Sequence, residues 1–380
     1  MELGFLPQAK KPGSTEEGLT SRKLADLIPY QRRPFTSLEI ELTTRCNLFC
    51  PSCPRAVYSR AWIEQDMSLE CFEKLLPVME QFQTVHFRGW GEPVLNPFFP
   101  EMVRTAYQSG ASLVLSSNGV KLPDLSLLPY FEAVTFRLDY GRASTYERRN
   151  PSARFNRVVF NLSKVLHWRD SENLTQPRLV ILFAKNRYSL RDLPVYLETA
   201  LRLRPDRVAF YRPLFHVRRV DAQGHLPGEV DPGLVVKIDQ RLESAAREAG
   251  VDLVNQAVGP GQARDRCGFD SEKGLFVNWS GRAALCRYSA LPVAHGTYTR
   301  FFPDGEKVGH TTLLENLGRK DLESLISSSA YRLGRRACWL RGGQRSVAGP
   351  SFEEQAPEGA GGKLIYLPEA LARTGHCSSR

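Results

Sequence analysis

The sequence predicts an α/β protein whose core is a parallel sheet. Short apolar runs typical of strands alternate with amphipathic helical runs between about residue 36 and residue 215. Such alternation indicates βαβ units, in which a crossover helix joins two parallel strands. Polar and glycine-rich segments follow several of the strand-like runs. Because ligands of parallel sheets bind at the carboxyl ends of the strands, we expect one functional site at that edge.

Six apolar runs account for the expected strands. They are rich in residues that favour strands and have the length of one strand each: residues 38–42, 85–88, 113–117, 134–139, 179–184 and 207–211. Helices are predicted between them where apolar residues recur at helical spacing. One covers residues 68–76 and begins at Ser68, a good N-cap, and residues 99–109 and 193–203 show the same spacing.

Three cysteines follow the first strand-like run at the spacing C-x3-C-x2-C: Cys46, Cys50 and Cys53. A [4Fe-4S] cluster generally takes four cysteine ligands, so three leave one iron open to bind a substrate or cofactor. The alternatives are three unrelated cysteines or a zinc site. Zinc sites generally add a second C-x2-C pair or histidines, and neither follows within the next 30 residues.

The cysteine loop resembles the signature of the radical S-adenosylmethionine (SAM) superfamily. In that family the open iron is chelated by the amino and carboxylate groups of SAM. Reductive cleavage then gives a 5′-deoxyadenosyl radical, which abstracts a hydrogen atom. The resemblance implies a [4Fe-4S] cluster, SAM as cofactor, and a partial (β/α)6 TIM-like barrel over about half of the chain. Ser52 departs from the family pattern, because an aromatic residue usually packs by the adenine there.

The segment Gly89-Trp90-Gly91-Glu92-Pro93 resembles the family's GGE motif, with Trp90 where a glycine is often found. A glycine-rich turn after a strand lets the backbone approach a ligand closely. A carboxylate such as Glu92 accepts hydrogen bonds from an ammonium group. The resemblance therefore implies that Gly91 and Glu92 contact the methionine part of SAM. The alternative is an ordinary strand-to-loop turn.

Two further strand ends match the same family pattern. Ser117 and Asn118 occupy the place of a common Thr-Asn-Gly turn, and Asp139 ends the strand over residues 134–139. The resemblance implies that these three polar residues line the ribose and carboxylate side of SAM. Arg137 stands where a serine is usual, so no role is carried over to that residue.

Later cysteines resemble those of a second iron–sulfur site. Cys286 closes a predicted hairpin over residues 276–286, and Cys267 lies upstream of it. This arrangement is similar to the SPASM and twitch extensions of radical SAM enzymes, which bind auxiliary clusters. Together with Cys338 it implies one auxiliary [4Fe-4S] cluster, whose fourth ligand would be Cys377, the substrate or another group. The alternative is that these cysteines hold no metal.

Two other potential ligands are expected to be structural. Cys71 lies on the apolar face of the helix predicted over residues 68–76, where a small core residue fits. His86 lies on a predicted strand beside the Gly-Trp-Gly-Glu turn, and we expect a core histidine there and not a catalytic base.

The chain has 380 residues, enough for two domains. We predict a flexible lead-in over residues 1–34 and a radical SAM core over 35–230. A small α+β auxiliary domain is expected over 231–341, followed by a flexible tail over 342–380. No signal peptide and no apolar run long enough to cross a membrane are evident, and the eight cysteines suit a reducing cytoplasm.

The net charge is +10, and arginines cluster over residues 202–219 and 332–345. Such a surface suits an acidic peptide, a phosphorylated substrate, or an acidic reductant such as flavodoxin or ferredoxin. The alternative is a solvated arginine-rich surface. No nucleic-acid-binding motif is evident, so neither nucleic acid nor a membrane is an expected partner.

The sequence thus predicts a radical SAM oxidoreductase or maturase that takes hydrogen from a peptide or protein. A twitch-type dehydrogenase of a small sugar-like alcohol is the alternative within the same class. An iron–sulfur electron carrier or scaffold without SAM chemistry is the alternative from another class. Glu92 and the polar strand ends argue against a carrier, because a carrier does not need them. No catalytic side chain is assigned.

Overall fold

The computed structural model describes residues 35–184, 189–211, 216–222, 232–255, 274–302, 305–317, 322–329, 331–332 and 365–366. Three of the cysteines predicted to surround an auxiliary cluster lie outside these ranges: Cys267, Cys338 and Cys377. The predicted flexible segment 1–34 and nearly all of 342–380 also lie outside them. No described helix is long and apolar enough to cross a membrane.

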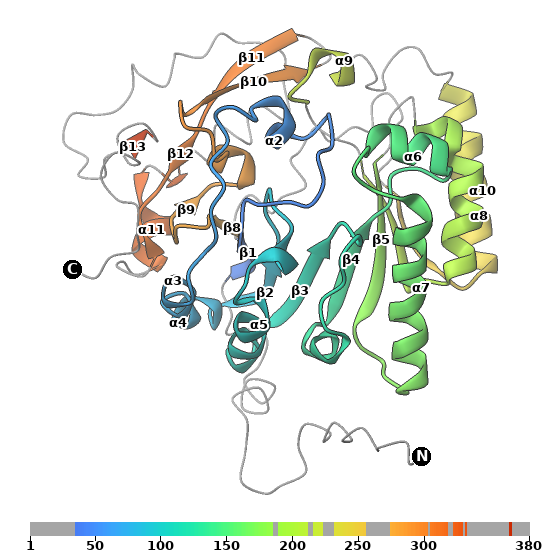
Figure 1. Cartoon of the computed structure of the whole chain (residues 1–380), viewed down its shortest axis with the longest axis horizontal. Coiled ribbons are helices and arrows are strands. Elements are labelled where there is room, and N and C mark those ends of the chain that lie inside the picture. The colour runs from blue at the N-terminus through green and yellow to red at the C-terminus, as the bar shows by residue number, and fades with distance from the viewer. Residues whose placement is uncertain are drawn as a thin grey trace, which may run out of the picture.

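In the described part of the chain, the core is a nine-stranded sheet in the order β7-β6-β5-β4-β3-β2-β1-β8-β9 (Figure 1). Every neighbouring pair from β7 to β8 is parallel, and β9 pairs with β8 in the antiparallel direction. The strands are β1 (Phe35–Ile40), β2 (Phe82–Phe87), β3 (Ser112–Ser117), β4 (Ala133–Arg137), β5 (Arg178–Ala184), β6 (Arg207–Tyr211), β7 (Asp252–Asn255), β8 (Gly274–Val277) and β9 (Ala283–Ala284). The expected α/β fold with a parallel sheet is confirmed.

Helices cover one face of this sheet, as Figure 1 shows for α5, α7, α8 and α10. The longer helices are α5 (Phe99–Gln108), α7 (Phe155–Ser171), α8 (Leu193–Leu203) and α10 (Pro232–Glu248). The shorter ones are α2 (Pro54–Val57), α3 (Leu69–Glu73), α4 (Leu76–Met79), α6 (Ala143–Arg149), α9 (Arg219–Ala222) and α11 (Leu322–Ser327). Buried Leu, Val, Ile and Phe side chains of the strands and helices form one large apolar core between them.

The helix expected over residues 68–76 is divided in two. Ser68 caps α3 as predicted, because its Oγ accepts a hydrogen bond from the backbone N–H of Cys71 at 3.1 Å. Pro77 lies in the first turn of α4, where its missing N–H removes no helical hydrogen bond. The chain therefore restarts a helix at that proline. Cys71 is buried in the apolar core, as expected.

The hairpin predicted over residues 276–286 is present as β8 and β9. Its turn needs a glycine, because Gly281 has φ +79 and its missing Cβ would lie 2.7 Å from the sulfur of Cys71. β8 also pairs in parallel with β1, so Leu275 lies opposite Leu38. The hairpin thus continues the core sheet.

The remaining strands form two small sheets. β10 (Thr297–Phe302) and β11 (Gly305–His310) make an antiparallel hairpin, and β12 (Thr312–Leu313) pairs with β13 (Ile365–Tyr366). The β10–β11 hairpin contacts the chain just after α2, where the hydroxyl of Tyr58 accepts a hydrogen bond from the N–H of Thr299 at 2.8 Å.

Candidate active site

The cysteine loop lies at the carboxyl end of β1 and ends at α2. Cys46, Cys50 and Cys53 are half-buried free thiols in this loop. Cys53 is the residue before α2, and its N–H donates to the carbonyl oxygen of Cys50 at 2.9 Å. This turn brings the second and third cysteines to the same end of the loop.

The start of the loop is held by charged and polar contacts. The guanidinium of Arg45 forms an ion pair with Asp66 at 2.6 Å and donates to the carbonyl oxygen of Leu95 at 2.9 Å. The hydroxyl of Thr43 also donates to Asp66, at 2.6 Å. Asn96 is buried and donates to the carbonyl oxygen of Leu42 at 2.6 Å. These contacts fix where the loop leaves the sheet.

The three thiols lie in a setting that disfavours thiolates without a cationic partner. Burial raises the pKa of Cys46 to about 11 and of Cys50 to about 12, and it also raises the pKa of Cys53. Iron–sulfur clusters bind thiolates, and coordination deprotonates a thiol outright. The loop therefore suits a ligand that brings positive charge with it.

The described part of the chain holds no group of three or more His, Cys, Asp or Glu side chains arranged around a single metal ion. A cubane cluster does not require that arrangement, because each of its cysteine thiolates binds a different iron. The donor set of three cysteines on one loop fits such a cluster.

The Gly-Trp-Gly-Glu turn after β2 packs directly on the cysteine loop. The N–H of Glu92 donates to the carbonyl oxygen of Arg45 at 2.8 Å. A Cβ on Gly91 would lie 2.3 Å from the carbonyl oxygen of Thr43 and 2.5 Å from that of Arg45. Since no side chain fits in that space, glycine is needed for the close approach of the two segments.

Glu92 is 2% exposed, and only one of its two carboxylate oxygens has a hydrogen-bond partner among the described residues. Its Oε2 accepts a hydrogen bond from the N–H of Asn118 at 2.8 Å, whereas its Oε1 is buried without a hydrogen-bond partner in the described structure. Burial raises the pKa of Glu92 to about 7, although the bonds from Asn118 and Ser117 oppose the shift. An ammonium group would satisfy the free oxygen and restore the carboxylate.

The end of β3 joins this turn to the cysteine loop. The side-chain amide of Asn118 donates to Oδ1 of Asn47 at 2.8 Å and lies 3.7 Å from the sulfur of Cys46. The hydroxyl of Ser117 accepts a hydrogen bond from the N–H of Gly119 at 3.1 Å. The structure therefore places Asn118 beside both Glu92 and the first cysteine, and Ser117 beside Glu92.

Asp139 lies just beyond β4 and is connected to the cysteine loop through Arg137. Its Oδ1 accepts a hydrogen bond from the N–H of Ala184 at 3.0 Å, and its Oδ2 forms an ion pair with Arg137. Arg137 in turn lies over the ring of Tyr211, 5.9 Å from the ring centre, and its charge favours the thiolate of Cys50. Both oxygens of Asp139 thus have protein partners already.

Two site residues carry no signal in the sequence. Asn150 follows α6, and its Oδ1 accepts a hydrogen bond from the thiol of Cys50 at 3.0 Å. Ser152 accepts a hydrogen bond from the N–H of Phe49 at 3.3 Å. Both are far from the cysteines in sequence and belong to no motif, so only the folded structure brings them together.

Cys286 is the described member of the predicted auxiliary set. It is half-buried and precedes η5 (Arg287–Ala290), where its N–H donates to the hydroxyl of Ser289 at 3.1 Å. The segment after Cys286 meets the Gly-Trp-Gly-Glu turn, because Nε1 of Trp90 donates to the carbonyl oxygen of Arg287 at 2.9 Å. The ring of Trp90 also meets Tyr288 edge-on at 5.0 Å.

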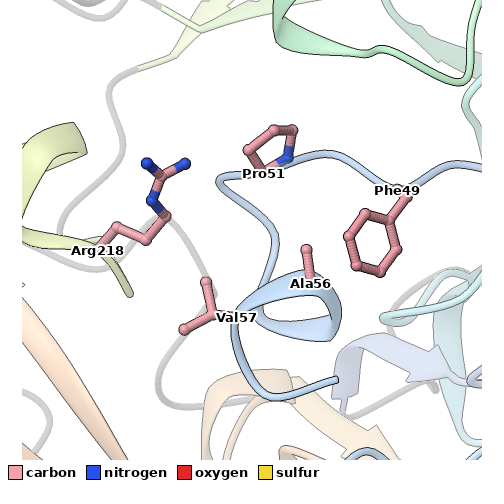
Figure 2. A pocket seen from close by; sticks show the side chains of 5 residues that line it. All are labelled: Phe49, Pro51, Ala56, Val57 and Arg218. Carbon is pink, nitrogen blue, oxygen red and sulfur yellow. The ribbon is translucent and has the colours of Figure 1, made fainter. Parts of the chain in front are cut away.

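An open hollow of about 330 Å³ lies beside the cysteine loop and α2. Figure 2 shows Arg218 facing the loop across this hollow. Its other lining residues are Phe49, Pro51, Ala56 and Val57. The outer side of the loop is therefore mainly apolar, with one cationic side chain opposite.

His86 lies on β2, and its structural role stays a prediction. It is partly buried, and burial lowers its pKa to about 4, so the imidazole is neutral at pH 7.

No family model matches the chain. The chain is similar to a tungsten-containing aldehyde ferredoxin oxidoreductase cofactor-modifying protein of Pyrococcus furiosus, with 25% identity over 305 residues, 77% of this chain and 81% of the relative. Its fold is similar to that of Streptococcus suis SuiB bound to S-adenosylmethionine, with a TM-score of 0.55, 13% identity and coverage of 82% of this chain and 70% of SuiB. It is also similar to anSMEcpe with bound AdoMet, with a TM-score of 0.56, 14% identity and coverage of 80% and 84%.

A three-cysteine loop follows the first parallel strand, and the Gly-Trp-Gly-Glu turn and polar strand ends surround it. Motifs, fold and relatives together support the assignment of this chain to the radical SAM superfamily of enzymes.

Proposed function

We propose that this protein is a radical SAM maturase that cleaves SAM reductively and abstracts hydrogen from a peptide or protein. The observation that carries the proposal is the free oxygen of Glu92, which is buried and has no protein partner in the part of the chain that is described. A buried, half-satisfied carboxylate is costly unless a ligand completes it. The ammonium group of SAM would supply the missing donors.

The residues that would hold the two cofactors lie together. Cys46, Cys50 and Cys53 would bind a [4Fe-4S] cluster, and Gly91 and Glu92 would receive the methionine ammonium. Ser117, Asn118 and Asp139 would face the ribose and carboxylate of SAM. When bound, the cluster and SAM supply the reductive cleavage that produces the hydrogen-abstracting 5′-deoxyadenosyl radical.

The chain itself positions these groups and limits access of water. Asn118 fixes one oxygen of Glu92, and the close fit of Gly91 against Thr43 fixes the distance between turn and loop. The rings of Trp90 and Tyr288 pack together beside the turn and shield it. Exclusion of water matters here because a reactive radical must meet only its substrate.

A peptide or protein substrate is supported by what similar folds bind. SuiB, which matches 82% of this chain, has a structure with the precursor peptide SuiA, and anSMEcpe has one with the Kp18Cys peptide. The relative from Pyrococcus furiosus modifies the cofactor of another enzyme, which also favours a maturase. A small sugar-like alcohol is the second candidate substrate.

The auxiliary cluster belongs to the same proposal. Cys286 would be one ligand, with Cys267 and Cys338, in the predicted region 231–341, whose strands β7, β8 and β9 belong to the core sheet. Its support is the resemblance of the cysteine pattern to SPASM and twitch extensions, and the contact between residues 286–288 and the Gly-Trp-Gly-Glu turn. A cluster there would accept an electron from the substrate.

A flavodoxin or ferredoxin in a reducing cytoplasm would supply the first electron. The basic net charge of the chain favours such acidic proteins. An electron carrier without SAM chemistry is the alternative from another class. Glu92 argues against it, because a carrier does not need a buried carboxylate aimed at a ligand.

The test is anaerobic incubation of the reconstituted protein with SAM and a reductant, with 5′-deoxyadenosine measured as the product. We expect wild type to form it and Cys50→Ala to lose it. Cys71→Ala is the matched control, because Cys71 is buried in the apolar core away from the proposed cluster. Product from Cys50→Ala equal to wild type would refute the cluster assignment.

The substrate class needs a separate measurement. A peptide fraction and a small-molecule fraction of the host cell are each added to the wild-type reaction. Stimulation of 5′-deoxyadenosine formation by the peptide fraction alone supports the maturase. Stimulation by the small-molecule fraction alone would favour the dehydrogenase.

A further inference from the structure

The face of the sheet opposite the helices carries charged side chains that the proposed SAM site does not use. Side chains alternate between the two faces along a strand. In β1, Leu38 and Ile40 are completely buried in the apolar core, so Glu39 between them points to the other face. Arg88, just after β2, shares that face, because its guanidinium pairs with Glu39 at 3.2 Å.

Arg287 approaches the same face from outside the sheet. Its carbonyl oxygen is held by Trp90, and its guanidinium lies 5.4 Å from the ring centre of Tyr288. Burial lowers the pKa of Arg88, and the charge of Arg287 lowers it further. Burial acts in the same sense on Arg287, but Glu39 and, to a smaller extent, Tyr288, Tyr211 and Cys286 together outweigh it and raise the pKa of Arg287. The two guanidinium groups therefore lie near one shared carboxylate.

Positive charge exceeds negative charge on this face. Arg137 has its own carboxylate, Asp139. Arg88 forms an ion pair with Glu39, and the same carboxylate also interacts with the charge of Arg287. One carboxylate cannot neutralise two guanidinium groups, so among these described residues one positive charge is left over.

The remaining carboxylate on this face does not remove the excess. Glu41 is completely buried, and burial raises its pKa to about 8, so it is mainly neutral at pH 7. The guanidinium of Arg287 has five N–H donors, but it forms no hydrogen bond or ion pair with another described residue. Arg287 is also only half-buried, so a ligand can reach it.

We propose that Arg287, assisted by Arg88, binds an anionic group of the substrate, a carboxylate or a phosphate. A planar guanidinium with free donors binds either group in a bidentate manner. The inference rests on the proposed function, because it assigns a charge to the substrate of that enzyme. The anion orients the substrate, and the surplus positive charge disfavours cationic competitors.

The experiment measures chemical modification of Arg287 by phenylglyoxal, read by mass spectrometry on anaerobically reconstituted protein. Inorganic phosphate and sodium acetate are the two probes, each with and without saturating SAM. At a probe concentration ten times its dissociation constant, we expect modification to slow about tenfold. Protection by phosphate alone indicates a phosphorylated substrate, and protection by both anions indicates a carboxylate site.

Arg202 on α8 is the matched control, because its side chain is 74% exposed and pairs only with Glu198 among the described residues. Its modification should not respond to either probe. Absence of protection at Arg287 would overturn the proposal. So would protection that disappears when SAM is present, because the anion site would then be the site of the SAM carboxylate.

The substitution Arg287→Gln separates this proposal from the proposed function. In wild type, bound phosphate should raise the melting temperature, and Arg287→Gln should lose that rise while it keeps the iron content of wild type. If wild type forms no 5′-deoxyadenosine, the proposed function fails, whatever the protection experiment shows. If Arg287→Gln keeps the phosphate effect, the anion site lies elsewhere and this inference fails alone.

Discussion

The backbone N–H of Asn118 holds Oε2 of Glu92 at 2.8 Å, so the end of β3 fixes the carboxylate that follows β2. The other oxygen of Glu92 is buried and has no partner among the described residues. One half of the carboxylate is thus held by the protein, and the other half is left for a ligand. Such preorganisation lets a ligand bind without first rearranging the site.

The substitution Glu92→Gln should weaken SAM binding. The amide keeps the shape of the side chain but loses the charge that attracts an ammonium group. Hydrogen bonds to charged groups contribute about 1.5–3 kcal/mol, so the dissociation constant should rise roughly ten- to 150-fold. Equilibrium dialysis with labelled SAM measures the change. Glu101→Gln on the exposed side of α5 is the control and should bind as wild type does.

The substitution Gly91→Ala should disturb the cysteine loop. The new Cβ would lie 2.3 Å from the carbonyl oxygen of Thr43, so one of the two backbone segments has to move. We expect a loss of stability of about 1–3 kcal/mol in urea unfolding and less iron bound after reconstitution.

Gly250→Ala is the control for this substitution. Its Cβ would enter open space, but φ is +68, which costs about 1–2 kcal/mol by backbone strain alone. It should be destabilised with its iron content unchanged. Full iron content in Gly91→Ala would contradict the tight packing of turn on loop.

Between about pH 4.5 and pH 8, the titration of Glu41 should make the protein less stable as pH rises. Its pKa is about 8 in the folded chain against 4.5 in the unfolded chain, because burial disfavours the charged form. Between these pH values the native state binds more protons than the unfolded state, so the free energy of unfolding decreases as pH increases.

The substitution Glu41→Gln removes this titration while leaving the hydrogen bond from Trp90 possible. Between pH 5 and pH 9, the free energy of unfolding of the variant should rise by on the order of 4 kcal/mol relative to that of wild type. Urea unfolding at the two pH values measures the difference. Stability curves that run parallel for the two proteins would show that Glu41 does not titrate with a raised pKa.

Iron content tests the two cysteine sets separately. Wild type should hold about eight irons and the triple alanine variant of Cys46, Cys50 and Cys53 about four, if each set binds its own cluster. Cys286→Ala should also retain about four. A wild type with about four irons and a triple variant with none would mean that the later cysteines hold no cluster. Iron and acid-labile sulfide per chain are the measurements.

The parallel sheet could be predicted because its strands are local apolar runs. The predicted run 207–211 coincides with β6, and the helix over 193–203 coincides with α8. The first strand ends at Ile40, two residues before the predicted end at Leu42. The carbonyl oxygen of Leu42 accepts from Asn96 and from the N–H of Met67, and such distant partners leave no local signal.

Pairings between distant segments could not be predicted for the same reason. β7 has four residues, too short for its pattern to stand out, and α10 before it continues the strand–helix alternation beyond residue 230. The site residues likewise fall into two groups, those marked by a motif and those brought together only by packing. Motif order indicated Glu92 and Asn118, whereas the contact of Asn150 with Cys50 depends on how α6 packs.

The pairing of β8 with β1 makes the strand that leads to the cysteine loop depend on a late part of the chain. β1 lies between β2 and β8, and removal of β8 would leave the backbone groups of β1 on that side unpaired at a sheet edge. During synthesis the ribosome must deliver residue 277 before this strand is flanked on both sides. Folding of the cysteine loop is therefore coupled to synthesis of the chain through β8, and cluster loading before that point would meet an unfinished site.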